Sequence, residues 1–81
     1  MKNYYLEFHN IYDIKNIIEH IESLGYVDGV GPNAILPAVV ERYILCRGNK
    51  YYLCGFEPNH PKEEYIKCDN LEIFYNKLTN N

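Results

Sequence analysis

No apolar run in this sequence approaches the roughly 18 residues that a membrane-spanning helix needs, which excludes a transmembrane helix. The first residues also lack an uninterrupted apolar stretch of signal-peptide length, and the three cysteines are an odd number. Both features disfavour a secreted disulfide scaffold and predict a cytoplasmic protein. An excess of basic residues is missing too: 8 Lys and Arg against 11 Asp and Glu give a net charge of −3, which argues against a general nucleic-acid binder.

The composition that remains is that of an ordinary folded domain. Apolar residues make up 47% of the chain and charged residues 23%, so a disordered chain is not expected. With 81 residues there is room for one hydrophobic core only. We therefore expect a single domain over residues 1–81.

The first third of the chain predicts a strand followed by a helix. Residues 4–8 alternate between apolar and polar positions as a half-buried strand does. Asn10 is a good N-cap with Asp13 at the N3 position, and isoleucines then recur at helical spacing up to Gly25. Gly25 suits a left-handed C′ residue, and Tyr26 then falls where a contact back to Ile21 would complete a Schellman motif.

The remainder predicts a loop, a hairpin, a short strand and a final helix. Residues 27–37 are rich in turn-forming residues and read as a loop. Strands over 39–46 and 51–56 are joined across Gly48-Asn49, which fits a two-residue II′ turn. A short strand over 64–68 precedes a helix capped by Asp69, with Glu72 at N3 and an apolar stripe of Leu71, Phe74, Tyr75 and Leu78. The expected fold is α+β, in the order β-α-β-β-β-α, with a mostly antiparallel four-stranded sheet and two helices.

The hairpin register predicts two largely apolar sheet faces. It sets Cys46 opposite Tyr51 and Tyr43 opposite Cys54, so that Ile44, Cys46, Tyr51 and Leu53 share one face and Tyr43, Leu45, Tyr52 and Cys54 the other. Two short helices can cover only one face. Either a Tyr-rich face stays open for a second copy or a partner, or the terminal helix or the long loop folds over it.

Cysteines and histidines give no pattern of a metal or catalytic site. There is no Cys-x-x-Cys or His-x-x-x-His spacing, and the register puts Cys46 and Cys54 on opposite faces, so neither a zinc site nor a disulfide is indicated. A nucleophilic pair of Cys68 with His9 or His60 is an alternative, although nothing nearby marks an activated thiol. Scattered acidic residues form no general acid–base pair. We expect no cofactor, no metal and no enzyme activity.

Two segments carry residues suited to binding a small anion-bearing ligand. The loop around Gly29, Gly31 and Asn33 has the glycine content to bring backbone N–H groups near a phosphate or carboxylate. Around the hairpin, the cations Arg42, Arg47 and Lys50 alternate with aromatic rings that could stack on a base: Tyr43, Tyr51 and Tyr52. A plain connecting loop and a solvated hairpin tip are the alternatives for these two segments.

Leu24-Gly25-Tyr26 after an amphipathic helix, then a Gly/Pro loop ending in Ile35-Leu36-Pro37, then a Tyr-rich hairpin, resembles a class of small phage-encoded anti-defence α+β proteins. The resemblance implies a role in the host cytoplasm against bacterial immunity. It allows two modes of action: sequestering a nucleotide immune signal as an oligomer, or docking on a defence protein.

Together these observations predict a non-enzymatic homo-oligomer that binds a cyclic oligonucleotide or an ADP-ribose derivative. In this reading the tyrosines stack, Arg42 or Arg47 holds phosphate, and residues 29–33 act as a lid. The alternative is a protein inhibitor that presents its acidic surface or a sheet edge to a host defence protein.

Overall fold

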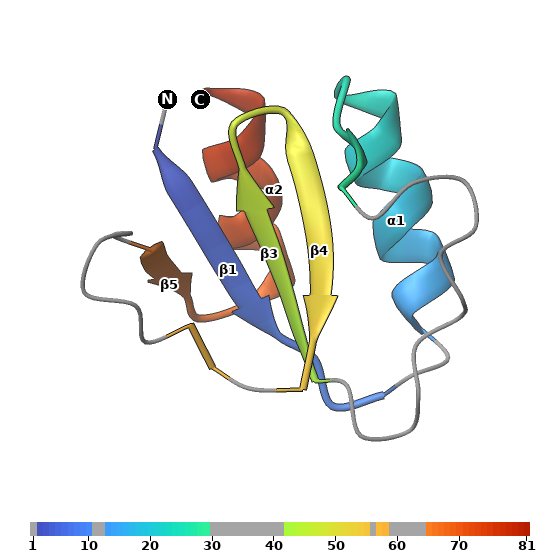
Figure 1. The fold of residues 1–81 in the computed structure, drawn as a ribbon, viewed down its shortest axis with the longest axis vertical. Helices are drawn as coiled ribbons and strands as arrows, with labels where there is room; N and C mark the ends of the chain where they lie inside the picture. The colour runs from blue at the N-terminus through green and yellow to red at the C-terminus, as the bar shows by residue number, and fades with distance from the viewer. Residues whose placement is uncertain (1, 11–12, 30–41, 56, 59–64) are drawn as a thin grey trace.

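The computed structural model describes residues 2–10, 13–29, 42–55, 57–58 and 65–81. Five strands and two helices lie in these ranges (Figure 1), in the order β1 Asn3–Glu7, α1 Ile14–Ser23, β2 Val27–Asp28, β3 Tyr43–Arg47, β4 Lys50–Cys54, β5 Tyr65–Cys68 and α2 Leu71–Thr79. The architecture is α+β with two helices, as predicted. Neither helix is long and apolar enough to cross a membrane.

The predicted four-stranded, mostly antiparallel sheet is wrong in two respects. The sheet has five strands in the order β2-β4-β3-β1-β5, and it is mixed. The central pairs β1–β3 and β3–β4 are antiparallel, whereas the outer pairs β1–β5 and β2–β4 are parallel. The additional strand β2 lies at the start of residues 27–37, for which the sequence predicts a loop. Its pairing depends on the distant β4, through Val27 N–H to the Asn49 carbonyl at 2.8 Å and Gly29 N–H to the Tyr51 carbonyl at 2.9 Å.

The hairpin between β3 and β4 forms as the sequence predicts. Tyr43 pairs with Cys54, Ile44 with Leu53, Leu45 with Tyr52 and Cys46 with Tyr51. Gly48 has φ +60°, and no residue other than glycine has a positive φ in the described ranges, which matches a II′ turn with glycine at its first central position. The strands are shorter than expected, and residues 39–41 and 56 lie outside the described residues.

Helix α1 ends as predicted but begins later. Its N-cap is Asp13, and Asn10 instead accepts the Asp13 N–H in a turn at 3.1 Å through its backbone carbonyl. At the other end Gly25 has φ +101°, the Gly25 N–H donates to the Glu22 carbonyl at 3.0 Å, and the Tyr26 N–H to the Ile21 carbonyl at 3.2 Å. This pair of bonds is the Schellman motif.

Helix α2 is capped one residue later than predicted. The Asn70 side chain, and not that of Asp69, accepts the Ile73 N–H at 2.8 Å, so Glu72 lies in the first turn but not at N3. Within its expected apolar stripe Phe74 and Leu78 are buried and Tyr75 packs against the core, but Leu71 is exposed. The end of the chain lies beside the start of β1 (Figure 1). There the Lys2 N–H donates to Asn81 Oδ1 at 2.9 Å.

The hydrophobic core lies between the helices and one face of the sheet. It joins isoleucines of α1 and Phe74 and Leu78 of α2 to alternate residues of the strands: Tyr4, Leu6, Ile44, Cys46, Tyr51 and Cys68. Figure 1 shows α2 behind the strands. We call the opposite side of the sheet the outer face.

Candidate functional site

The outer face carries the residues that alternate with those of the core. Register places Tyr5 beside Leu45 on β3 and beside Lys67 on β5, and Leu45 beside Tyr52 on β4. Tyr5 and Leu45 are buried although they lie outside the helix-side core, whereas Tyr43, Tyr52 and Tyr65 are half-buried. The middle of this face is therefore inaccessible to solvent, and the accessible polar and charged groups lie at its two ends.

One end of the outer face is cationic. Arg47 and Lys50 face each other directly across the hairpin, and both are exposed. Tyr52 lies two residues beyond Lys50 on the same strand, hence on the same face. Successive residues on one face of a strand are about 7 Å apart, so an aromatic residue and two cationic residues are neighbours on this face. We call Arg47, Lys50 and Tyr52 the cationic end.

The ring of Tyr52 is seated over Gly29. A Cβ atom at position 29 would overlap Tyr52 Cε1, so a side chain at this position would force the ring to move. Gly29 is fixed by the bond from its N–H to the Tyr51 carbonyl at 2.9 Å, which brings the end of β2 alongside β4. Glycine at this position allows the ring to lie on the backbone, and the contact restricts how the ring can turn.

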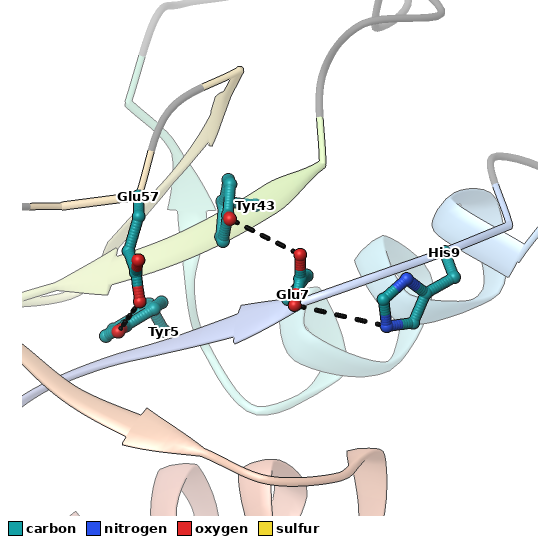
Figure 2. Close-up of polar contacts among 5 residues, drawn as sticks. All are labelled: Tyr5, Glu7, His9, Tyr43 and Glu57. Atoms are coloured by element: carbon teal, nitrogen blue, oxygen red, sulfur yellow. Dashed lines mark hydrogen bonds and ion pairs between the residues drawn. The ribbon is translucent and has the colours of Figure 1, made fainter.

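The other end of the outer face is acidic (Figure 2). The Tyr5 hydroxyl donates to Glu57 Oε1 at 2.6 Å, and the Tyr43 hydroxyl donates to Glu7 Oε2 at 3.3 Å. Glu7 Oε1 also lies 4.0 Å from His9 Nε2. Burial raises the pKa of the Tyr5 hydroxyl to about 12, and the hydrogen bond and charge of Glu57 add to the rise. We call Glu7, Glu57 and Tyr43 the acidic end, together with Tyr5, whose hydroxyl reaches Glu57 from the middle of the face.

The three tyrosines that are predicted to stack on a ligand lie in three different parts of the structure. Tyr43 lies at the acidic end, where loss of hydration and then the charge of Glu7 raise the pKa of its hydroxyl. Tyr51 lies on the helix side, where it is buried and donates to Glu22 Oε2 of α1 at 2.9 Å. Of the three predicted stacking residues, Tyr52 alone stands beside the cations of the hairpin.

The arginines are separated as well. Arg42 precedes β3, with its N–H bonded to the Cys54 carbonyl at 3.0 Å and its carbonyl accepting the Phe8 N–H at 2.8 Å. Five residue steps of extended chain, about 17 Å, separate it from Arg47. The expected cluster of Arg42, Arg47 and Lys50 around the hairpin is thus wrong for Arg42. Gly31 and Asn33 of the predicted binding loop lie outside the described residues.

Lys50 belongs to the predicted group of hairpin cations, but only Arg42 or Arg47 was expected to hold phosphate. The hairpin register that pairs Cys46 with Tyr51 also sets Lys50 opposite Arg47 and on the face of Tyr52. The acidic end could not be found in this way. It needs Glu57, which follows β4, to return beside Tyr5 of β1, 52 residues away in the chain.

The cysteines are placed as structural residues. Cys46 and Cys68 are buried in the core, and burial raises the pKa of the Cys46 thiol to about 12 and that of Cys68 above its ordinary value. Both thiols are therefore protonated near neutral pH, which is the poorly nucleophilic form. Cys54 is half-buried on the outer face, opposite in direction to Cys46 as predicted. The described ranges contain no group of three metal-ligating side chains, and His60 lies outside them.

Comparisons of the chain with protein-family models, with curated proteins and with solved structures each gave no match.

Proposed function

We propose that this protein is a non-enzymatic binding protein that takes a nucleotide-type ligand at the cationic end of the outer face. The observation that carries the proposal is the position of the Tyr52 ring, seated on Gly29 and on the same face as Arg47 and Lys50. Aromatic rings stack on bases of any sequence, and guanidinium groups pair with phosphate in a bidentate manner.

The spacing at this end suits a nucleotide. Arg47 and Lys50 lie about one strand repeat, 7 Å, from Tyr52 towards the hairpin turn, so a nucleotide whose base lies on the Tyr52 ring can place its phosphate beside them. The restricted ring adds to the fit, because a ring that is already ordered loses little conformational entropy when it binds. Tyr43 and Arg42, which are predicted ligand contacts, do not belong to this site because Tyr43 lies at the acidic end and Arg42 precedes β3.

The biological role follows from the resemblance to small phage anti-defence proteins. In that role the ligand is a nucleotide immune signal, a cyclic oligonucleotide or an ADP-ribose derivative, which a homo-oligomer sequesters in the host cytoplasm. The protein acts by holding the signal away from its receptor. Turnover of the ligand is not part of the proposal.

The test is thermal unfolding of the pure protein with a panel of mononucleotides, cyclic oligonucleotides and ADP-ribose derivatives. A ligand present at 100 times its dissociation constant stabilises the fold by about 2.7 kcal/mol, a shift of roughly 10 °C or more in a domain of this size. A ligand found in this way is then titrated by calorimetry against Arg47→Ala and Tyr52→Ala. Each change is expected to weaken binding by about tenfold or more.

Arg42→Ala is the matched control, because it removes the same type of side chain at the end of β3 opposite to Arg47. Unchanged affinity in Arg42→Ala together with loss in Arg47→Ala supports the site. Equal loss in both arginine variants, or no loss in Arg47→Ala, contradicts it.

The acidic end favours a second candidate function, docking on a host defence protein. Glu57 is exposed and Glu7 half-buried, and both carboxylates are held by tyrosine hydroxyls in a fixed arrangement that could pair with a basic surface. A flat nucleotide panel, followed by recovery of a stoichiometric host partner that Glu7→Gln with Glu57→Gln releases, would establish this function instead.

A further inference from the structure

Strand β5 forms one margin of the sheet. It pairs with β1 on one side, and the part of the chain that the structure describes adds no strand beyond it. An edge strand directs alternate N–H and C=O groups outwards, where another strand can pair with them. Exposed apolar side chains gather here. Of the four large hydrophobic residues exposed in the described ranges, Ile66 lies in β5 and Leu71 and Ile73 lie in the first turn of α2 that follows it.

The orientation of α2 places Ile73 on the same margin as Ile66. Phe74 and Leu78 of α2 point into the core, and Tyr75 points towards α1, where its ring stacks on His20 with centroids 3.8 Å apart. Residues 73 and 75 are about 200° apart around a helix, so Ile73 lies on the side away from α1. Lys77 is one turn further along that side, and its charge acts on the pKa of the Cys68 thiol in β5. Ile66 and Ile73 thus flank one apolar margin.

From this arrangement we infer that β5 is a dimerisation edge, which pairs antiparallel with β5 of a second copy of this chain across a two-fold axis. The two sheets then join into one, and the axis passes beside Ile66. We call this surface the β5 edge, made of Tyr65, Ile66, Lys67 and Ile73.

The sequence of β5 selects a second copy and one register. With the axis at Ile66, this residue meets Ile66 of the second copy on the helix side. Tyr65 then meets Lys67 of the second copy on the outer face, since Tyr65 and Lys67 share that face. The lysine stem covers the tyrosine ring, and its ammonium group lies near the ring face, a favourable cation–π arrangement. The pairing is self-complementary, as an isologous interface must be.

The neighbouring register is disfavoured by charge. An axis at Lys67 would set two ammonium groups directly opposite each other, and like charges in that position destabilise a strand pair. Lys67 therefore does more than keep the edge soluble: it disfavours the register centred on Lys67 relative to the one centred on Ile66. The same two-fold axis brings the α2 helices of the two copies together on the side that carries Ile73.

The full chain is tested by sedimentation equilibrium over a wide range of protein concentration. We expect a dimer for the wild type and a monomer for Ile66→Lys, which places two lysines at the axis. Val27→Lys is the matched control, because Val27 is the exposed apolar residue of β2 at the opposite margin of the sheet. It should remain dimeric.

Circular dichroism checks that each variant is folded, and Ile73→Lys gives a second, independent disruption of the same margin. A monomeric wild type at all concentrations, or a dimer that survives both Ile66→Lys and Ile73→Lys, overturns the inference. A dimer that survives both changes overturns the β5 edge alone. A monomeric wild type also removes the homo-oligomer from the proposed function, but ligand binding at the cationic end is measured separately and can still hold.

Discussion

The Tyr51 hydroxyl joins the central hairpin to helix α1, by donating a 2.9 Å hydrogen bond to Glu22 Oε2. Tyr51 is buried on the helix side of β4, and Glu22 lies on the exposed face of the last turn of α1. The Tyr51 ring therefore packs in the core, while the Tyr51 hydroxyl reaches the surface and donates to a charged acceptor. The finding assigns Tyr51 to the framework of the fold and not to the outer face.

Removing this hydroxyl should cost stability and leave the outer face intact. We expect Tyr51→Phe to lower the free energy of unfolding by about 1 kcal/mol, because the ring still packs but one hydrogen bond to a charged group is lost. Urea unfolding measures the change. Glu19→Gln, an exposed carboxylate one turn earlier on α1, is the control and should have little effect. A loss in Glu19→Gln as large as that in Tyr51→Phe would contradict the proposed link.

The raised tyrosine pKa values predict a loss of stability at alkaline pH. In the unfolded chain a tyrosine ionises near its ordinary pKa of 10.0, whereas Tyr5 in the folded protein does so at about 12. Both states are neutral at this residue below about pH 10, so its contribution to stability is fully present there. As the pH rises towards 12 the unfolded chain releases the proton first, and the contribution is lost.

Urea titrations at a series of pH values measure this dependence. Tyr5→Phe should make stability fall less steeply between about pH 10 and 12. Part of the pH dependence should remain in this variant, because Tyr43, Tyr51 and Tyr75 also have raised pKa values. Glu57→Gln tests the cause. Because burial is the largest contribution at Tyr5, removal of the Glu57 charge should lower the pKa of Tyr5 only in part. A Tyr5→Phe variant with an unchanged pH profile would count against the assignment.

Local features of the fold were predictable because local chemistry determines them. The II′ turn at Gly48-Asn49 sets the hairpin register by its length, and Gly25 ends α1 because it is the residue that adopts a positive φ cheaply. Capping was harder. Asn10 and Asp69 both have cap-forming side chains, yet the helices start at Ile14 and Leu71, since neighbouring residues with equal propensity compete and tertiary packing decides.

The parallel pairs of the sheet could not be read from the sequence. Strand β2 has only two residues, and its existence depends on bonds to Asn49 and Tyr51, over twenty residues away. The same applies to the site. Tyr52 and Arg47 were predictable from the register, but the contact of Tyr52 with Gly29 needs β2 to be in place first, and the Tyr5–Glu57 bond needs the chain after β4 to return to β1.

The C-terminal turn of α1 gives a prediction that concerns the backbone alone. Gly25 has φ +101°, and a Cβ atom added there would meet no atom within 4 Å. Any cost of Gly25→Ala therefore comes from the strained backbone, which we expect to be about 1 kcal/mol. Gly25→Asn should cost less, because asparagine adopts positive φ more readily than alanine does. Thermal unfolding of the two variants measures the order, and an alanine variant as stable as the wild type would show that the chain can relax to a negative φ at this turn.

At Gly29 we expect the opposite cause: the cost of a substitution comes from the added side chain and not from the backbone. Its φ is outside the left-handed region, so alanine is allowed there, but the added Cβ would overlap the Tyr52 ring. We expect Gly29→Ala to lower the free energy of unfolding by about 1–3 kcal/mol, because the Tyr52 ring must move away from residue 29. In a Tyr52→Ala background the same change should cost only a few tenths of a kcal/mol, since nothing then occupies the space above residue 29.

The double-mutant cycle of Gly29→Ala and Tyr52→Ala, measured by urea unfolding, gives the coupling between the two positions. A large coupling energy places the Tyr52 ring on Gly29 in solution. Equal costs in the two backgrounds would mean that the ring lies elsewhere, and the stacking platform proposed for the cationic end would lose its support. If the platform binds a base, Gly29→Ala should also weaken ligand binding about as much as Tyr52→Ala does, although it leaves every cation of the site in place.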